Sequence, residues 1–461
     1  MAHPAPSDTI AAIATAPGES AIAIVRLSGP DTYPLADRLF RAPPPLPSAR
    51  PAGTFFRGQV IHPETSETLD DALMLLFRAP HSYTGEESVE IHCHGGSQPA
   101  QRVLEALLVA GARQAEPGEF TKRAFLNDKL DLTQAEAVLD LIHARSERAA
   151  RLATAQLENA LGHEIRTLYE TLLALCADIE AMLDFPDDEL PQSVPKELSE
   201  RMSPIETGIQ ALLDTWHEGH LLREGARIVI AGAPNVGKST LLNLLAGRPR
   251  AIVSPHPGTT RDTIEEFITL NGYPMHLIDT AGLRDAPGDI EQEGIRRAHQ
   301  ALSQADLTLC LVDASQPISQ AELAFIFSHD PQKRIVLGTK ADLGVVADPQ
   351  QLPPLDYFPV SLIIDAPLAQ IKAKIIDKVL GECPRSDHSD IAISGRHRKS
   401  LLIALDEFIM AKKRLNSGSE ADFLPAALHS RAALDQLGHI LGLNISDAML
   451  DAVFSRFCVG K

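Results

Sequence analysis

The sequence predicts a chain of mixed α/β and all-α class, in which two α/β domains are combined with one helical domain. Three observations predict this arrangement. Short apolar runs alternate with turn signals over residues 1–120, strand–loop–helix alternation occupies residues 224–383, and leucine-rich helical periodicity flanks that second block on both sides. Helices before and after a compact α/β block indicate one discontinuous helical domain, residues 121–223 and 384–461, with the second α/β domain inserted into it. Two unrelated helical segments are the less economical alternative.

Composition narrows the class of protein before any motif is considered. The 461 residues, 44% hydrophobic and 22% charged, suit a globular protein of two to four domains. Apolar runs are too short to span a bilayer and the N-terminus lacks a signal-peptide pattern, so we expect a cytoplasmic protein with no membrane association. The five cysteines are odd in number and widely spaced, which excludes a disulfide framework. The net charge of −19 disfavours broad nucleic-acid binding, although a local basic patch is compatible with RNA.

The first domain is predicted to be a small α/β unit. Runs at residues 10–13, 21–27, 72–77 and 88–92 have the composition of strands. The segment His92-Cys93-His94 resembles a metal site, but alternation along a strand would put the cysteine on the face opposite the two histidines. A glycine turn after a strand is therefore favoured over zinc.

The helical domain is predicted from apolar residues that recur every three or four positions, with Phe185-Pro186 ending the first long helix. Similar periodicity returns after Pro384. The residues of the first stripe are Leu157, Leu161, Ile165, Leu168, Leu172, Leu175, Ile179 and Met182.

The second α/β domain contains a phosphate-binding loop. Residues 232–239 fit the pattern GxxxxGK[ST] and lie between a predicted strand, 227–231, and a predicted helix, 241–246. Glycines allow backbone N–H groups to surround the phosphates, Lys238 reaches the β and γ oxygens, and Ser239 binds Mg²⁺. The expected nucleotide-binding residues of this loop are Asn235, Val236, Gly237, Lys238, Ser239 and Thr240.

Two further motifs are predicted to surround the γ-phosphate. Asp279 ends the apolar run 275–278 and is expected near the metal, with Thr280, Ala281 and the Gly282 amide following toward the phosphate. Thr259 and Thr260 belong to a switch I candidate, in which Thr260 completes the Mg²⁺ shell in the GTP state. Together with the phosphate-binding loop, these motifs predict a P-loop, Ras-like GTPase domain.

The choice of GTP over ATP depends on Thr339-Lys340-Ala341-Asp342, which follows the apolar run 335–338. The Asp342 carboxylate can accept hydrogen bonds from N1–H and N2–H of guanine, and adenine offers no such pair of donors. Most GTPases have asparagine where Thr339 stands. Because threonine can make one of the amide's hydrogen bonds, we expect a modest loss of affinity and no change of base preference. Ser361 is a candidate for the last base-contacting loop, with Leu362 replacing the usual small residue.

The hydrolytic machinery differs from that of Ras-like enzymes. Leu283 occupies the position of the glutamine that orients the attacking water. Arg261 and Arg284 are arginine-finger candidates for which surface solvation is the more ordinary reading. Glu291 and Glu293 are candidates for orienting the water, and solvated switch-region charges are again the alternative. The catalytic site is therefore expected to be completed by a cation, a partner or a carboxylate.

The sequence closes with Cys458-Val459-Gly460-Lys461, which has no role in nucleotide hydrolysis. A thiol beside the positive Lys461 and the flexible Gly460 suits a nucleophile or a redox group. A small buried hydrophobe and an incidental exposed thiol are the alternatives. The last residues do not fit a prenylation signal.

The chain resembles the MnmE (TrmE) family of tRNA-modification GTPases over essentially its whole length. The run from Arg123 to Ala137 and the C-terminal motif carry most of the specificity, since a phosphate-binding loop alone is widespread. Besides the nucleotide motifs, the resembling segments are DTIAA at 8–12, VRLSG at 25–29, YTGEE at 83–87, RAFLNDKLDLTQAEA at 123–137 and FCVGK at 457–461.

The resemblance implies a folate-binding-like N-terminal α/β domain that binds a 5-formyltetrahydrofolate-type one-carbon donor and forms a homodimer. Arg26, Glu90, Lys129 and Lys461 match positions that the family uses around the folate, and Cys458 would lie near it. Two GTPase domains would meet in the GTP state with the help of K⁺, and Glu291 matches the family's water-orienting glutamate. The positions that match the K⁺ site are Asn235, Ser254, His256 and Thr259.

The resemblance also implies a partner and a reaction. With the FAD-containing MnmG protein, in a heterotetramer, the chain would add an aminomethyl or carboxymethylaminomethyl group at C5 of the wobble uridine of certain tRNAs. The alternative is a regulatory GTPase switch in ribosome assembly or signalling, which would lack use for a terminal thiol. A structural protein with vestigial GTPase activity is disfavoured because Lys238, Ser239, Thr260 and Asp279 are intact.

Overall fold

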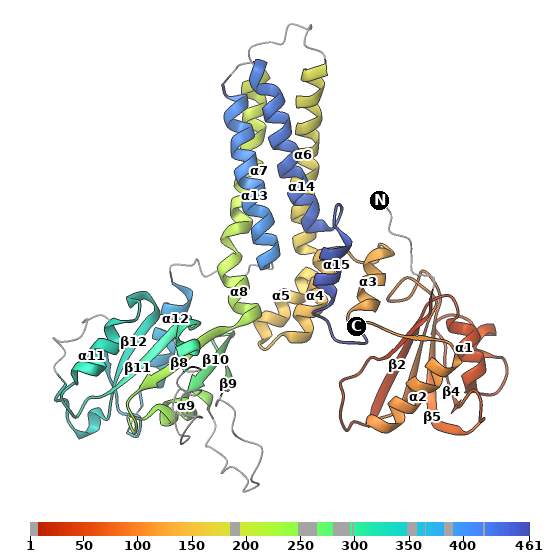
Figure 1. The fold of residues 1–461 in the computed structure, drawn as a ribbon, viewed down its shortest axis with the longest axis horizontal. Coiled ribbons are helices and arrows are strands. Elements are labelled where there is room, and N and C mark those ends of the chain that lie inside the picture. The colour runs from red at the N-terminus through yellow and green to blue at the C-terminus, as the bar shows by residue number, and fades with distance from the viewer. Residues whose placement is uncertain are drawn as a thin grey trace. The chain divides into compact units, whose positions relative to one another are not determined.

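The computed structural model describes residues 8–184, 194–247, 265–279, 296, 299–347, 357–364, 366–381, 391–417 and 420–461. They form two compact units, between which the chain passes four times. Unit 1 comprises Met1–Leu139, Gln156–Ile209 and Lys399–Lys461, and unit 2 comprises Asp140–Ala155 and Gln210–Arg398. The predicted combination of α/β and helical parts is confirmed (Figure 1).

Unit 1 begins with a seven-stranded sheet of order β3-β4-β5-β6-β2-β1-β7, antiparallel except where β1 pairs with β7. Helices α1 and α2 bury their apolar faces against it, and their side chains join those of β2, β5 and β6 in one core. Burial alternates along β2, as a strand with one covered face requires. The elements are β1 (Ile10–Ile13), β2 (Ile22–Ser28), α1 (Thr32–Leu39), β3 (Phe40–Arg41), β4 (Phe55–Ile61), β5 (Thr68–Phe77), β6 (Ser88–His94), α2 (Ser97–Ala110) and β7 (Arg113–Gln114).

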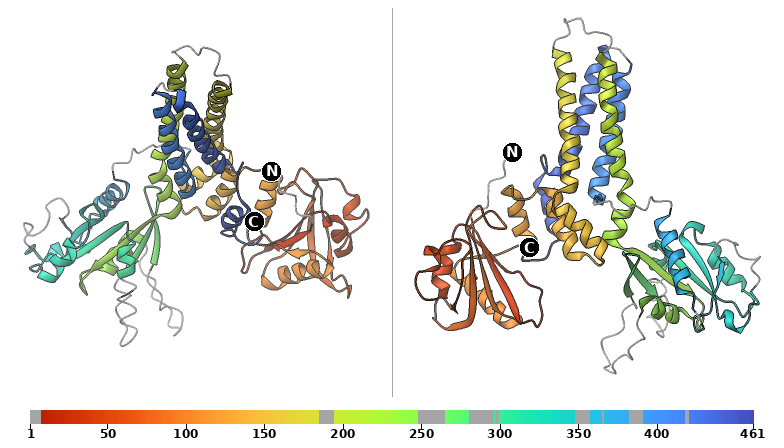
Figure 2. Two further views of the ribbon diagram at one scale, coloured as in Figure 1. Left: turned by 45° about the horizontal axis from the view of Figure 1, so that its top comes forward. Right: turned by 180° about the vertical axis from the view of Figure 1, so that it is seen from behind.

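Long helices form the second part of unit 1, and Figures 1 and 2 show α6, α7, α13 and α14 side by side. The predicted stripe is buried at Leu161, Ile165, Leu172, Leu175 and Ile179. No helix among the described residues has the length and apolar character needed to cross a bilayer. The helices that lie wholly or mostly in unit 1 are α3 (Glu119–Leu126), α4 (Leu132–His143), α6 (Ala160–Asp184), α7 (Val194–Asp214), α13 (Gly395–Leu415), α14 (Phe423–Leu441) and α15 (Asp447–Phe454). Two further helices, α5 (Glu147–Leu157) and α8 (Trp216–Glu224), lie wholly or mostly in unit 2.

The first long helix is shorter at its start than the periodicity predicts. Leu157 is the last residue of α5, and α6 begins only at Ala160. Between them, Asn159 adopts a left-handed backbone with φ of 72°, which cannot continue a right-handed helix. An apolar repeat can run across such a break, because the next helix presents its own stripe. Phe185-Pro186, the predicted end of the helix, lies outside the described residues.

Unit 2 is built on a six-stranded sheet of order β13-β12-β11-β8-β10-β9, in which only β9 runs antiparallel to its neighbour. The carboxyl ends of β8, β10, β11 and β12 therefore meet at one edge, where open α/β sheets bind ligands. The elements are β8 (Ala226–Gly232), α9 (Lys238–Ala246), β9 (Glu265–Leu270), β10 (Tyr273–Asp279), β11 (Leu307–Asp313), α11 (Gln320–Phe327), β12 (Arg334–Thr339), η4 (Ala341–Leu343), β13 (Tyr357–Pro359) and α12 (Leu368–Leu380).

Three segments of the predicted helical domain, 140–155, 210–223 and 384–398, belong to unit 2. Residues Asp140–Ala155, which include α5, are grouped with the second sheet. Ala149 and Leu152 of α5 join the core that the strands of this sheet form. The predicted domain boundaries at 120, 223 and 383 stay predictions.

Candidate functional site

The phosphate-binding loop connects β8 to α9, in the strand–loop–helix context that the sequence predicts. Its backbone is left-handed at Asn235 and Gly237. A side chain on Gly232 would collide with the Leu311 carbonyl oxygen of the neighbouring strand, so only glycine fits there. This tight turn directs successive backbone N–H groups toward one point, which is how such loops hold phosphate.

Three side chains that the sequence assigns to the phosphates and their metal are brought together. The Lys238 ammonium is almost fully buried and donates to the carbonyls of Gly232 at 3.1 Å and Ala233 at 2.7 Å. The Ser239 hydroxyl donates to a carboxylate oxygen of Asp279, 3.2 Å away, and Asp279 is buried at the end of β10. A hydroxyl and a carboxylate are oxygen ligands of the kind that Mg²⁺ accepts, so this pair fits the predicted metal.

The base-reading segment follows β12 at the same edge of the sheet. Lys340 has a left-handed backbone and its ammonium lies 2.7 Å from the Asp313 carboxylate at the end of β11. Burial tends to raise the pKa of Asp313, but its hydrogen bonds to Lys340 and Ser315 outweigh this and lower the pKa below its usual value. Asp342 lies in the short helix η4, next to this ion pair in sequence.

The Ser361 loop lies beside the base-reading segment, because the Ala341 amide donates to the Val360 carbonyl at 3.2 Å. The Ser361 hydroxyl accepts hydrogen bonds from the amides of Ile363 and Ile364, which fold the loop into a turn. Leu362 is buried, with a methyl group 3.2 Å from where a side chain on Gly237 would begin. Leu362, which replaces the small residue usual at this position, thus packs against the phosphate-binding loop.

Several predicted site residues lie outside the described residues, and they all belong to the two segments expected around the γ-phosphate. They are Ser254, His256, Thr259, Arg261 and Thr260 in the first segment, and Thr280, Ala281, Gly282, Leu283, Arg284, Glu291 and Glu293 in the second.

A second cluster of predicted site residues lies in unit 1. Arg26 on β2 is paired in register with Glu90 on β6, and their side chains form an ion pair of 2.8 Å. Nε2 of His92 lies 3.3 Å from the same carboxylate. The Arg26 guanidinium also lies over two aromatic rings, 5.3 Å from the centre of Tyr83 and 5.6 Å from that of Phe120. A pair of opposite charges and two aromatic rings are thus gathered at the inner strands β2 and β6 of the sheet.

The C-terminal tail, residues 458–461, is fixed to this region by its backbone. Val459 forms a bridge with Pro117, and the amides of Gly118 and Phe120 donate to the carbonyls of Cys458 and Lys461 at 3.3 and 3.2 Å. Gly460 is left-handed, and a side chain there would collide with the Ile13 carbonyl oxygen of β1. The Cys458 thiol itself is exposed. The tail therefore contacts Phe120, whose ring faces the Arg26 guanidinium. Three of the four residues predicted to bind folate, Arg26, Glu90 and Lys461, thus lie in the same region of unit 1.

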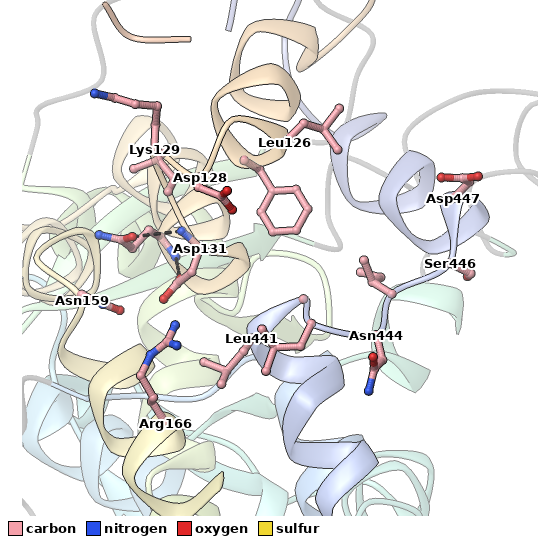
Figure 3. Close-up of a pocket in the computed structure, with 16 residues that line it drawn as sticks. Leu126, Asp128, Lys129, Asp131, Asn159, Arg166, Leu441, Asn444, Ser446 and Asp447 are labelled. Atoms are coloured by element: carbon pink, nitrogen blue, oxygen red, sulfur yellow. Dashed lines mark hydrogen bonds between the residues drawn. The ribbon is translucent and has the colours of Figure 1, made fainter. Parts of the chain in front are cut away.

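Lys129, the fourth, is held separately. Its ammonium donates to the Pro80 carbonyl at 3.0 Å, and its methylene groups contact Gly85 in the loop that also carries Tyr83. Lys129 lines a cavity of about 800 Å³ whose walls mix positive, negative and apolar side chains. Figure 3 shows Asp131, Asn159 and Arg166 gathered on one side of this cavity. The Asp131 carboxylate there accepts from the Gln134 amide at 2.9 Å and so caps α4.

Sequence reasoning missed the ion network that supports the tail. Arg123, in the run 123–137, is fully buried and pairs with Asp8, Glu86 and Glu119. Burial tends to raise the pKa of Glu119, yet hydrogen bonds from Arg113, a backbone amide and Arg123 lower it below its usual value. The sequence does contain a signal for this network. Arg123 is followed by apolar residues on a short helix, and a buried arginine in such a place needs acidic partners.

The strand–loop–helix turn with Lys238, Ser239 and Asp279 at one sheet edge, followed by a base-reading aspartate, defines a P-loop GTPase. Residues 132–458 match the MnmE helical domain and residues 9–129 match the N-terminus of the GTP-binding protein TrmE. The chain therefore belongs to the MnmE family, and it is a GTPase.

Relatives are similar over their whole length. The chain is 43% identical to the tRNA modification GTPase MnmE of Chloroflexus aurantiacus, covering 99% of the chain and 100% of the relative. It is 41% identical to that of Moorella thermoacetica, covering 98% of the chain and 99% of the relative. It is 38% identical to the tRNA modification GTPase MnmE of Natranaerobius thermophilus, covering 98% of the chain and 99% of the relative.

Proposed function

We propose that this chain is the GTP-hydrolysing subunit of a cytoplasmic complex that modifies C5 of the wobble uridine of tRNA, together with MnmG. The observation that carries the proposal is the fixed C-terminal tail, which carries an exposed thiol and is bound by its backbone to Phe120, the residue whose ring faces Arg26 of the Arg26–Glu90 pair. A protein whose sole task is to hydrolyse GTP has no use for this second site. The relatives named above are tRNA modification GTPases, which agrees with the proposal.

For the GTPase step, the positions of Lys238, Ser239, Asp279 and Asp342 support the proposed roles, and Thr260 and Glu291 are assigned by the family resemblance. Lys238 binds the β and γ oxygens, Ser239 and Asp279 hold Mg²⁺ with Thr260, and Asp342 selects guanine. The metal neutralises charge on the phosphates during transfer. Glu291 orients the attacking water.

A potassium ion is proposed to complete this site in place of an arginine finger. Asn235 of the phosphate-binding loop is the described member of the proposed K⁺ set, and its left-handed backbone lies in the turn that surrounds the phosphates. Ser254, His256 and Thr259 are the other members. A cation there would neutralise the charge that develops between the β- and γ-phosphates.

The N-terminal domain is proposed to bind a 5-formyltetrahydrofolate-type donor in a homodimer. The chemistry of the cluster fits such a ligand, because Arg26 can bind a carboxylate, Glu90 can accept from a ring amino group, and the rings of Tyr83 and Phe120 offer stacking surfaces. The folate would supply the one-carbon unit. Cys458 and Lys461 of the anchored tail would act on the bound folate, and Lys129 would contribute a positive charge to its binding.

Nucleoside mass spectrometry on bulk tRNA tests the proposal. Cells lacking the protein are complemented with wild type or with Cys458→Ser, and GTP turnover of both proteins is measured alongside. We expect wild type to restore a C5-modified wobble uridine, and Cys458→Ser to hydrolyse GTP normally without restoring it. Unchanged nucleosides in the deletion strain would reject the proposal and favour the regulatory GTPase switch instead.

A further inference from the structure

Thr339 is bound to the phosphate-binding loop and has no hydrogen left to donate to a nucleotide. It ends β12, three residues before Asp342, and 1% of its surface is exposed. Its hydroxyl oxygen lies 2.6 Å from the Val236 carbonyl of the phosphate-binding loop and 3.1 Å from the Val312 carbonyl of β11. A hydroxyl carries one proton and both neighbours are acceptors, so that proton is used within the protein.

The asparagine that most GTPases have at this position is chemically different. An amide carries two N–H donors, so one asparagine can donate to the loop carbonyl and to the base at the same time. Guanine presents N7 and O6 as acceptors on the edge opposite the one that Asp342 reads. A donor is required to hold N7. Thr339 preserves the contact with the loop and gives up the contact with the base.

Among the described neighbours, two other side chains could in principle donate to the base. The Lys340 ammonium is engaged by Asp313 at 2.7 Å. The Thr339 methyl group lies 3.9 Å from where a side chain on Gly237 would begin, so this side chain packs on the loop. Ser361 accepts hydrogen bonds from two backbone amides, and within the described part of the chain its own proton is the alternative donor that a test must include.

We propose that this GTPase reads guanine on its N1–N2 edge alone, so that guanine nucleotides without an N7 acceptor bind as well as the natural ones. Thr339 is then a positioning residue for the phosphate-binding loop and Asp342 is the sole base-selecting side chain. The proposal rests on the proposed role of Asp342 and is independent of the tRNA chemistry.

Calorimetric titration of the full chain in Mg²⁺ tests the proposal with three nucleotides: GDP, 7-deaza-GDP, which lacks the N7 acceptor, and IDP, which lacks the 2-amino group. For wild type, we expect the dissociation constants of GDP and 7-deaza-GDP to agree within about twofold. In Thr339→Asn the amide regains the second donor, and we expect 7-deaza-GDP to bind about 3- to 10-fold more weakly than GDP. IDP should bind more weakly than GDP in both proteins.

Further variants separate the roles of the neighbouring side chains. Thr339→Val removes the hydroxyl and leaves the Val236 carbonyl without its donor, so we expect GDP and 7-deaza-GDP to weaken by the same factor. Ser361→Ala should leave their ratio unchanged. Thr308→Val, a buried threonine of β11 away from the site, controls for the loss of any buried hydroxyl and should change neither constant.

The proposal would be overturned if wild type bound GDP about fivefold or more tightly than 7-deaza-GDP. If the Ser361→Ala variant then lost this preference, Ser361 would be the donor to N7. This comparison uses the wild-type chain and does not depend on any variant folding. Equal binding of IDP and GDP would overturn the role of Asp342, a different failure from the first. Loss of nucleoside modification would bear on neither result.

Discussion

Arg123 shows how strongly a single buried charge depends on its partners. No part of its side chain is exposed, and carboxylates of Asp8, Glu86 and Glu119 surround it. Removing one partner of a buried charge costs about 3–5 kcal/mol when nothing replaces it. Here the partners come from three separate segments, so this residue joins the N-terminal strand, the loop before β6 and the helix α3.

Glu119→Gln should therefore weaken unit 1 in a pH-dependent way. The folded pKa of Glu119 lies below its ordinary value of 4.5, so the carboxylate contributes stability above that pH and loses it as the pH falls through the folded pKa. We expect wild type to exceed the variant by about 2 kcal/mol in free energy of unfolding at pH 6, and the difference to shrink below pH 4.5. Urea unfolding at several pH values measures it. A difference that grows in acid would contradict this assignment.

Gly460→Ala should separate the two chemistries of the chain. The new methyl group would collide with the Ile13 carbonyl and displace the tail. We expect a loss of tRNA modification of roughly a hundredfold, because a small displacement of a reacting group is costly, with GTP turnover unchanged. Gly111→Ala is the matched control, since Gly111 is also left-handed but faces open space. If both variants lost tRNA modification equally, backbone strain and not displacement of the C-terminal tail would be responsible.

At the scale of secondary structure, α5 and the turn before it are docked on the β9–β10 hairpin by Arg148 and Arg145, respectively. The Arg145 guanidinium lies 3.6 Å from the centre of the Phe267 ring. The Arg148 guanidinium pairs with Glu218, which also accepts from the Tyr273 hydroxyl at 3.0 Å. The strand β9 begins at Glu265, shortly after the residues predicted as switch I, which lie outside the described residues.

Arg148→Ala should destabilise unit 2 by about 2–4 kcal/mol, because it leaves the buried Glu218 carboxylate without its cation. Trp216, the one tryptophan of the chain, lies at the start of the helix that carries Glu218 and reports the transition by fluorescence. Arg151→Ala is the control, since Arg151 pairs with Glu147 on the surface and should change stability by less than about 0.5 kcal/mol. Equal effects would rule out a special role for the buried pair.

The parts of this fold that the sequence predicts well are those in which neighbours in sequence are neighbours in space. The phosphate-binding turn requires Gly232 and Gly237 between a strand and a helix, and all of this lies within a few residues. The binding of the C-terminal tail is different. Pro117 and Gly118 contact Val459 and Cys458, which are separated from them by most of the sequence. No local periodicity encodes such a contact. The break at Asn159 is not predicted for a second reason, since apolar spacing does not register a single left-handed residue.

At the scale of the whole molecule, each unit has its own core and its own site. The nucleotide site is built entirely within unit 2, whereas the tail and the Arg26–Glu90 cluster belong to unit 1. The chain passes between them four times, so neither unit is a continuous stretch that could be lost by a simple truncation. A ligand of one unit is therefore expected to stabilise that unit first.

Hydrogen exchange with and without GDP tests this expectation. At a hundredfold excess of GDP over its dissociation constant, the free energy of opening in β8, β10, β11 and β12 should rise by about 2.7 kcal/mol. Amides of β2, β5 and β6 in unit 1 should exchange at unchanged rates. Mass spectrometry of peptic peptides resolves the two sets. An equal rise in both would show that the units open together.

The anchored tail also determines the order in which a newly made chain can mature. The sheet of unit 1 leaves the ribosome early, but the amides of Gly118 and Phe120 find their acceptors only when residues 458–461 have been synthesised. At translation rates of about 5–20 residues per second that delay is on the order of tens of seconds. The region translated first is thus the last to gain all of its hydrogen bonds. Ribosomes that stall late would release chains able to consume GTP but lacking the thiol.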